Sequence, residues 1–252
     1  MRTLAALLLA LAPLGALAQP DVPTDPSLPV DLTVVLQGAY EAGAGTMRTS
    51  LAAGGVIPAA QPYSDPAFEG TPAAYGGPET NASPPPNAVD WVVLEARTSP
   101  AAADSVSAVA ALLLADGSVV AASGSGLPAF PRLSVGSYYV VVRHRNHAPA
   151  MSAAPVDFAS GTGTFDLIAN GAAFGASGTV EVAVDVWALW AADATLDGLA
   201  TAPDFNVFSI ASASGETGYA IADYTLDGLV TAPDFNLYST NAAAGAAATV
   251  PE

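Results

Sequence analysis

The stretch Tyr138-Tyr-Val-Val-Val-Arg-His-Arg145 is the strongest strand candidate in this chain of 252 residues. Aromatic and β-branched residues fit the pleated surface of a sheet, so the run predicts a β-strand. Gly136, two residues before it, marks a turn. A sheet that contains this strand is therefore expected to be the main element of the fold.

Further short strands are predicted on both sides of this stretch. Asp116-Gly117 is a tight-turn signal between two of them and predicts a hairpin. Short strands separated by turn signals, with no helical pattern between them, favour a mainly β fold, an antiparallel β-sandwich over residues 30–186. The other predicted strands are 31–37, 89–96, 106–114, 119–121, 130–135, 156–158, 164–168 and 180–187.

Two segments carry a resemblance to known extracellular domains. Phe130-Pro-Arg-Leu-Ser-Val-Gly-Ser-Tyr-Tyr139 resembles the strand-turn-strand of immunoglobulin-like or prealbumin-like domains. Residues 30–190 also resemble domains of bacterial surface proteins, through Leu36-Gln-Gly-Ala-Tyr40 and Val89-Asp-Trp-Val-Val-Leu-Glu95 among others. These resemblances imply a secreted or cell-surface module of a bacterium and assign no activity.

Residues 38–86 are rich in Gly, Ala and Pro and are predicted to be irregular, with a short helix near Met47–Leu51. So long an irregular stretch suggests a surface or binding loop. Aromatic side chains in or beside it could stack on a sugar, or could pack in the core and anchor the loop. These side chains are Tyr40, Tyr63, Phe68, Tyr75 and Trp91.

A repeat follows Trp190. The segment Asp193-Ala-Thr-Leu-Asp-Gly-Leu-Ala-Thr-Ala-Pro-Asp-Phe-Asn206 recurs thirty residues later as Asp223-Tyr-Thr-Leu-Asp-Gly-Leu-Val-Thr-Ala-Pro-Asp-Phe-Asn236, with twelve of fourteen positions identical. Agreement this close indicates a duplication of one structural unit.

Each copy has the spacing of a twelve-residue calcium loop, which supplies oxygen ligands from positions 1, 3, 5, 7, 9 and 12. Glycine at position 6, Gly198 or Gly228, permits the sharp turn that brings the ends of the loop together. Two Ca²⁺ ions are therefore predicted. Threonine at position 3 leaves three carboxylates per loop, so modest affinity is expected. The predicted ligands are Asp193, Thr195, Asp197, Leu199 through its carbonyl, Thr201 and Asp204 in the first loop, and Asp223, Thr225, Asp227, Leu229, Thr231 and Asp234 in the second.

A helix is predicted after each loop. In Thr201-Ala-Pro-Asp204, the threonine can cap the helix, proline fits the first turn and the aspartate lies three residues after the cap. Phe205 and Phe208 then fall on one helical face, as do Phe235 and Tyr238.

This pair of loop–helix units resembles the type I dockerin module over about residues 187–244, followed by a tail at 245–252. The resemblance implies a protein partner, because dockerins bind cohesins near loop positions 10 and 11. Here these positions are Ala202-Pro203 and Ala232-Pro233 in place of the usual polar pair. Two interpretations stay open: docking onto a partner, or a structural calcium clamp packed on the sandwich.

The N-terminus predicts export. A basic start, an apolar run and Ala16-Leu-Ala18 predict a secretory signal peptide at residues 1–18, followed by a spacer at 19–29 and by no membrane-spanning segment. The net charge of −17 disfavours nucleic-acid binding, and the absence of cysteine excludes thiol catalysis and thiolate zinc sites. A secreted or cell-surface location follows from these features.

Both histidines lie in His144-Arg-Asn-His147. Residues three apart on a strand face opposite sides, so a zinc site would need a bend at Asn146, and a structural role is favoured. Arg143 and Arg145 on the same face as His147 could pair with a buried Asp90 or Glu95, or could form an anion or sugar-acid site. No catalytic motif is present, so the expected function is non-enzymatic. It is either a calcium-stabilised adhesion or assembly module, or a carbohydrate-binding accessory of a polysaccharide-degrading system.

Overall fold

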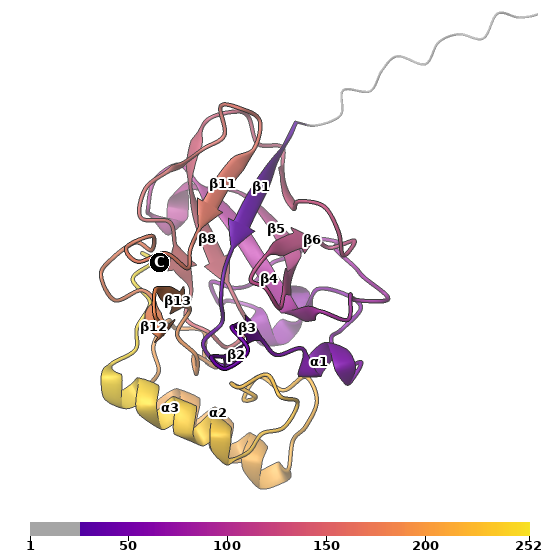
Figure 1. Cartoon of the computed structure of the whole chain (residues 1–252), viewed down its shortest axis with the longest axis vertical. Coiled ribbons are helices and arrows are strands. Elements are labelled where there is room, and N and C mark those ends of the chain that lie inside the picture. Colours follow the sequence, from indigo (N-terminus) through magenta and orange to yellow (C-terminus); the bar gives the residue numbers. More distant parts are fainter. Residues whose placement is uncertain (1–25) are drawn as a thin grey trace, which may run out of the picture.

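The computed structural model describes residues 26–252. The predicted signal peptide and the first part of the predicted spacer lie outside the described residues. The described chain is mainly β with three α-helices, and none of these helices is long and apolar enough to cross a membrane. In Figure 1 the strands form the upper body, and helices α2 and α3 lie together below it.

Most of the predicted strands are present, but the strand predicted at 31–37 lies four residues earlier, and the short strands at 40–41, 46–47 and 150–151 were not predicted. β1 starts at Ser27, inside the predicted spacer. The strands are β1 (Ser27–Thr33), β2 (Tyr40–Glu41), β3 (Thr46–Met47), β4 (Ala88–Arg97), β5 (Ser105–Leu114), β6 (Val119–Ala121), β7 (Ala129–Pro131), β8 (Ser137–Arg143), β9 (Ala150–Met151), β10 (Val156–Asp157), β11 (Gly163–Asp166), β12 (Val180–Ala183) and β13 (Val186–Ala188).

The largest sheet has the order β10-β8-β4-β5-β6, with β9 also paired to β8, and all its pairs are antiparallel. The predicted hairpin is confirmed as β5–β6. Every residue of β4 is buried, which is typical of a central strand covered on both faces. Because β4 carries Asp90, Glu95 and Arg97, its burial requires these charges to be paired.

A second sheet, in the order β11-β1-β7, lies across the first in Figure 1 and packs Leu28, Val30 and Leu32 into the common core. Two facing sheets are consistent with the predicted β-sandwich. The prediction of purely antiparallel pairing was wrong at one position, because β1 and β11 pair in parallel, from Val30 with Gly163 to Thr33 with Asp166. A parallel pair requires a long connection between its strands, and a local sequence pattern does not encode it.

The single strand predicted at 180–187 is instead the hairpin β12–β13. Asp185 has a φ of 59°, a left-handed conformation that reverses the chain there. An aspartate tolerates this conformation better than most residues, but no glycine marks the turn in the sequence.

The irregular stretch is anchored to the core by a few buried side chains, while many of its other residues are exposed. The helix predicted at 47–51 is α1 (Ser50–Ala53), and Met47 belongs to β3. Two 3₁₀ turns follow, at Pro62–Ser64 and Pro66–Phe68, and their aromatic side chains Tyr63 and Phe68 join the main core. Tyr63, which is 1% exposed, donates a hydrogen bond to the Trp91 carbonyl.

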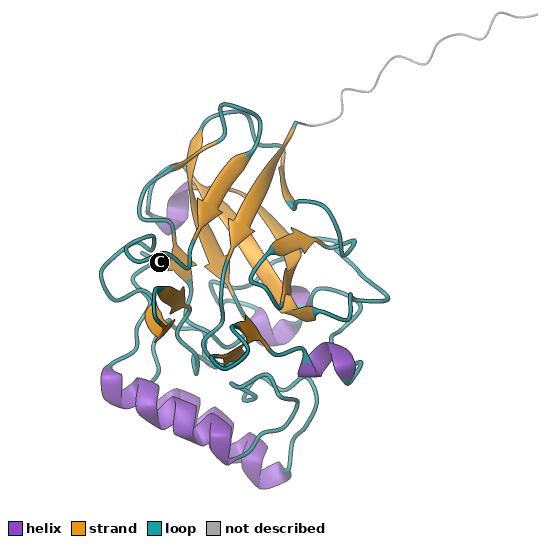
Figure 2. Cartoon of the chain, in the orientation of Figure 1, coloured by secondary structure: helices purple, strands orange, loops and turns teal. Residues whose placement is uncertain are grey.

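The C-terminal quarter contains α2 (Ala202–Ser214) and α3 (Ala232–Ala244), each preceded by one copy of the repeat. The order along the chain is loop, helix, loop and helix, with no helix directly before either loop, and Figure 2 shows the two helices together below the strands. Both helices begin after the predicted threonine cap, and both end at a left-handed glycine, Gly215 or Gly245. A separate, alanine-rich core containing Phe208 and Tyr224 holds the two units together.

This quarter is joined to the sheets by hydrogen bonds between side chains far apart in the sequence. The amides of Gln37 and Asn241 exchange two hydrogen bonds, of 3.0 and 2.7 Å. The side chain of Asn146 donates to the carbonyls of Ile221 and Asp223. The two parts therefore share a polar, buried interface rather than a flexible junction.

The residues predicted as a tail also pack against the sheets. The carboxylate of Glu252 lies 2.9 Å from the Arg143 guanidinium, and the carbonyl of Pro251 accepts a hydrogen bond from Arg97 at 2.7 Å. Arg97 and Arg143 both pair with Glu95 as well. Of the two alternatives for the arginines, the ion pair with a buried carboxylate is thus the one observed.

Candidate metal centre

In the first loop, the structure brings together the residues at positions 1, 3 and 12. Asp193 is 1% exposed, and its carboxylate accepts hydrogen bonds from the N–H groups of Asp197 and Gly198, both at 3.1 Å. The buried Asp204 accepts from the N–H and the hydroxyl of Thr195, both at 2.9 Å. Its other oxygen accepts from the Thr201 N–H at 2.8 Å, which closes the first turn of α2.

The second loop repeats this arrangement. Asp223 accepts from Asp227 and Gly228, and Asp234 accepts from the N–H and hydroxyl of Thr225. Asp223 and Asp234 are both fully buried. The same contacts in two copies show that the repeated sequence encodes one local structure.

The predicted ligands at positions 5, 7 and 9 are less enclosed. Asp197 is exposed, and its carboxylate accepts from the Leu199 N–H at 3.0 Å. The side chains of Leu199 and Leu229 point to solvent, with 42% and 48% exposed. Asp227 lies 4.0 Å from the Arg48 guanidinium, a contact absent from the first loop.

Both loops use the left-handed conformation at two positions. Gly198 and Gly228 have φ of 79° and 89°, as their position-6 role predicts. Leu196 and Leu226 at position 4 have φ of 61° and 56°, which is costly for a leucine side chain. Each loop then pairs with the segment after the other helix, Leu199 with Ala247 and Leu229 with Thr217. The surrounding structure thus holds both loops in a bent conformation.

Burial concentrates negative charge in the loops. Desolvation, followed by the charges of Asp204 and Asp197, raises the pKa of Asp193 to about 7. Desolvation also raises the pKa of Asp223 to about 6, although hydrogen bonds from Gly228 and the charge of Arg145 oppose this rise. Arg97, Arg143 and Arg145 pair with Glu95 and Asp90 elsewhere, and the chain has no lysine.

Within residues 26–252, no three His, Cys, Asp or Glu side chains are arranged so that they would hold a metal ion. The loop carboxylates face N–H groups of their own loops, as described above. The donor set still fits Ca²⁺ in its chemistry, because each loop offers carboxylate, hydroxyl and carbonyl oxygens. Binding would require the carboxylates to exchange some of these hydrogen bonds for the ion.

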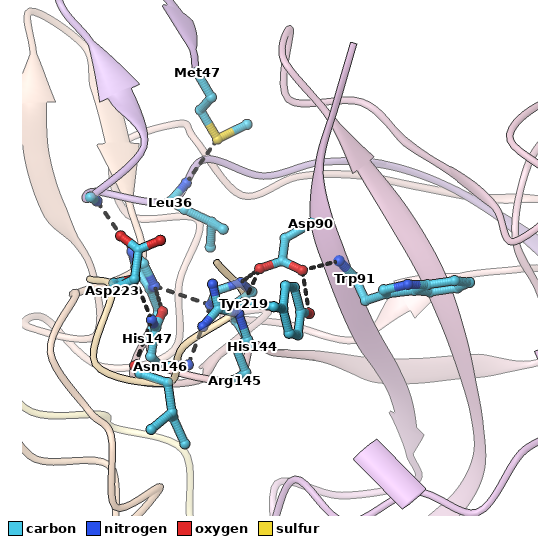
Figure 3. A network of polar contacts seen from close by, with 12 residues as sticks. Leu36, Met47, Asp90, Trp91, His144, Arg145, Asn146, His147, Tyr219 and Asp223 are labelled. Carbon is cyan, nitrogen blue, oxygen red and sulfur yellow. Dashed lines mark hydrogen bonds and ion pairs between the residues drawn. The ribbon is translucent and has the colours of Figure 1, made fainter. Parts of the chain in front are cut away.

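A network of buried polar side chains lies between the sheets and the second loop (Figure 3). Asp90 accepts from Arg145 Nε at 2.8 Å, lies 3.1 Å from His144 Nε2, and accepts from the Tyr219 hydroxyl. The charges of Arg145 and His144 and these hydrogen bonds outweigh burial and lower the pKa of Asp90. Sequence reasoning named Asp90 and Arg145 as a candidate pair but missed Tyr219, for which no local signal exists.

The two histidines are part of this network, and their hydrogen bonds define where the protons lie. The Gly38 N–H donates to His147 Nε2 at 3.1 Å, so the His147 proton is on Nδ1. That nitrogen lies 2.8 Å from Asn146 Oδ1 and 3.1 Å from His144 Nδ1. His144 therefore carries its proton on Nε2 and donates it to Asp90. This arrangement agrees with the structural role favoured for the histidines.

Because both histidines are buried, we expect the free energy of unfolding to fall in mild acid. Burial is the largest cause that lowers the pKa of His144 and of His147 below 6.5. The folded protein therefore binds fewer protons than the unfolded chain below this pH. The contribution of the two histidines to the free energy of unfolding is therefore complete above pH 6.5. It is lost as the pH falls, by up to about 1.4 kcal/mol per pH unit for each histidine.

Urea unfolding at pH 7.0, 6.0 and 5.5 in calcium-containing buffer measures this slope. Asp90, Arg145 and Asn146 surround the two rings, and Asp90 is not expected to take up protons in this range because its pKa is lowered. Asp193 and Asp223, whose pKa values are raised to about 7 and about 6, take up protons in this range and oppose the loss, so the histidine contribution is read from the difference between the wild type and a histidine variant. In a His144→Gln, His147→Gln variant the slope should flatten. An equal slope in the variant would assign the acid sensitivity to other groups.

No protein-family model matches the chain, and no curated protein matches it. A chain from a crystal structure of a type II cohesin–X-dockerin complex from Acetivibrio cellulolyticus, an N-terminal interface mutant, is similar over 60% of this chain and 79% of that chain. The sequence identity is 14% and the TM-score is 0.34.

Proposed function

We propose that this protein is a secreted or cell-surface, non-enzymatic binding or assembly module whose C-terminal quarter is a dockerin-like unit that binds two Ca²⁺ ions. The observation that carries this proposal is the duplicated loop, in which the carboxylates at positions 1 and 12 are buried, and within residues 26–252 none of them forms an ion pair with an arginine side chain. Buried carboxylates are costly unless a cation compensates them. Calcium would supply the compensating charge in both loops.

The ligands proposed in each loop are the residues at positions 1, 3, 5, 7, 9 and 12 named above. Calcium bound there would supply positive charge between Asp193 and Asp204 in the first loop, and between Asp223 and Asp234 in the second. Since position 12 is also the third residue of the following helix, each ion would join a loop to a helix N-terminus. The proposed role of calcium is therefore structural.

A non-enzymatic role is supported by the buried network. Asp90, His144 and His147 form a chain of hydrogen bonds of the kind used in proton transfer, but the cavity beside the histidines has a volume of only about 10 Å³. A space of this size holds at most one water molecule. A substrate could not reach these side chains without unfolding of the interface.

Thermal unfolding with calcium and with EDTA tests the proposal. An ion that binds only the folded state raises stability by mass action, by about 2.7 kcal/mol at a hundred times its Kd. Calcium should raise the Tm of the wild type and should have no effect on an Asp193→Asn, Asp223→Asn variant. These substitutions keep the side-chain shape and one of the two oxygens that accept from the loop N–H groups. An unchanged Tm of the wild type at millimolar calcium would contradict the proposal.

The alternative function is a carbohydrate-binding accessory whose C-terminal unit docks onto a protein partner. A specific observation favours its first half: a cleft lies at the boundary between the irregular segment and the C-terminal quarter. Docking onto a partner, the second half of this function, could use Phe205 and Phe235 near the starts of α2 and α3. Both side chains are about 40% exposed, and their rings contact one another.

A further inference from the structure

A cleft of about 570 Å³ lies between the irregular segment 58–68 and the segment 216–221, which links α2 to the second loop. Its walls are mainly apolar and include Pro58, Pro62 and Phe68 from one side and Tyr219 and Ile221 from the other. Arg145, which extends past the end of β8, also lines it. The cleft thus forms only where the three parts of the chain meet.

Both walls are held in place by hydrogen bonds. Gln61 is 3% exposed, and its side chain bonds to the N–H of Tyr63 and to the carbonyls of Tyr75 and Gly77. The Trp91 indole donates to the Pro58 carbonyl at 2.9 Å. On the opposite wall, the N–H of Gly218 donates to the Gly228 carbonyl, and the Tyr219 hydroxyl donates to Asp90. The cleft is therefore preformed, as ligand sites usually are.

Arg145 provides a polar group with unused hydrogen-bonding capacity. Its Nε donates to Asp90, its Nη1 donates to the Ala220 carbonyl, and its guanidinium carbon lies 4.2 Å from the centre of the Tyr219 ring. Its Nη2 is buried, yet no residue in the described range 26–252 offers it an acceptor. An unpaired buried donor costs about 1–3 kcal/mol, and a ligand oxygen would satisfy it.

The charges around the cleft select the kind of ligand. Asp90 already balances the Arg145 charge, and the exposed carboxylates of Asp65 and Glu216 lie on the rim. An anionic ligand would meet net negative charge, as it would over the rest of this acidic chain. A neutral ligand with hydroxyl groups can donate to the rim carboxylates and accept from Arg145. Its apolar ring faces can pack on the aromatic and proline side chains of the walls.

From these observations we infer that the cleft between segments 58–68 and 216–221 is a binding site for a neutral saccharide, with Arg145 Nη2 as the buried donor and Tyr219 and Phe68 as the packing surfaces. The site lies outside the proposed calcium ligands and does not depend on calcium occupying them. It would give the protein a carbohydrate ligand in addition to any protein partner.

Calorimetric titration of the purified chain, in calcium-containing buffer, tests this inference. The probes are neutral hexasaccharides of glucose, xylose and mannose, an oligomer of galacturonic acid, and a proline-rich peptide. We expect at least one neutral hexasaccharide to bind and the galacturonic acid oligomer to bind more weakly or not at all. Binding of only the acidic oligomer, binding of only the peptide, or no binding at millimolar concentration would overturn the inference.

Two variants locate the site. Ala67 is exposed and lines the cleft, so Ala67→Trp fills the cleft without changing the buried network. We expect its affinity to fall by at least about tenfold, an amount equal to 1.4 kcal/mol. The matched control is Ala59→Trp, which adds the same ring at an exposed position outside the cleft lining and should bind as the wild type does. Equal affinity of Ala67→Trp and wild type would place the saccharide elsewhere and overturn the inference.

Discussion

Replacing Asp90 with asparagine is expected to lower the free energy of unfolding by about 3–5 kcal/mol. Asp90 is fully buried in β4 and compensates the charge of Arg145, which is 1% exposed. The asparagine keeps the shape of the side chain but removes its charge. The guanidinium would then stay buried without a counter-ion, which costs far more than the loss of a surface ion pair.

Urea unfolding followed by tryptophan fluorescence measures this loss. Asp31→Asn is the matched control, because Asp31 lies on β1 with its side chain exposed. The control should change stability by less than about 0.5 kcal/mol. A second variant, Asp90→Leu with Arg145→Met, removes both charges and should be more stable than Asp90→Asn. A loss below about 1 kcal/mol in Asp90→Asn would show that the ion pair does not hold this interface.

Replacing Gly38 with alanine is expected to detach the C-terminal quarter from the sheets. A Cβ atom at this position would lie 1.8 Å from the Tyr224 carbonyl oxygen and 3.2 Å from the Leu237 side chain. Because the nearest group is backbone, the clash cannot be relieved by rotating a side chain. The expected loss of stability is about 3 kcal/mol, at the upper end of what added bulk costs in a packed interface.

Hydrogen exchange shows where the damage occurs. In Gly38→Ala, protection should fall in residues 190–246, while the amides of β4 and β5 keep most of theirs. The control is Gly43→Ala, since a Cβ at Gly43 meets nothing within 4 Å. Uniform loss of protection across both parts would mean that the sheets and the C-terminal quarter unfold as one unit.

Much of the sheet could be predicted from the sequence, because a strand is encoded by the type and spacing of neighbouring residues. The strands at 88–97, 105–114 and 137–143 were predicted to within about two residues, as was the β5–β6 hairpin with its Asp116-Gly117 turn. The predictions that failed concern strands paired over a long distance in the sequence, or a turn that no glycine marks. The parallel partner of β1 lies more than a hundred residues away, and the β12–β13 turn uses Asp185 in place of glycine.

In the irregular segment, the sequence does not predict which side chains are buried. Its composition predicts loops correctly, but a loop rich in proline and alanine reveals nothing about burial. The sequence leaves open whether Tyr63 and Phe68 stack on a sugar or pack in the core, and both side chains belong to the core. Of these two side chains, only Phe68 borders the cleft. No sequence pattern could indicate the cleft, because its opposite wall comes from residues 216–221.

The two loop–helix units could be predicted from local sequence alone. The aspartates, the position-6 glycine, the threonine cap and the proline of the first turn act within fourteen residues, and both copies adopt the same local structure in this chain. The contacts of Asp90 with His144, Arg145 and Tyr219, which are 54, 55 and 129 residues away in the chain, arise from the packing of the whole fold and have no local signal. The residues on either side of each partner in the sequence give no sign of this contact. Burial between the sheets and the C-terminal quarter is what forces them together, because a charge that leaves water must find a counter-charge nearby.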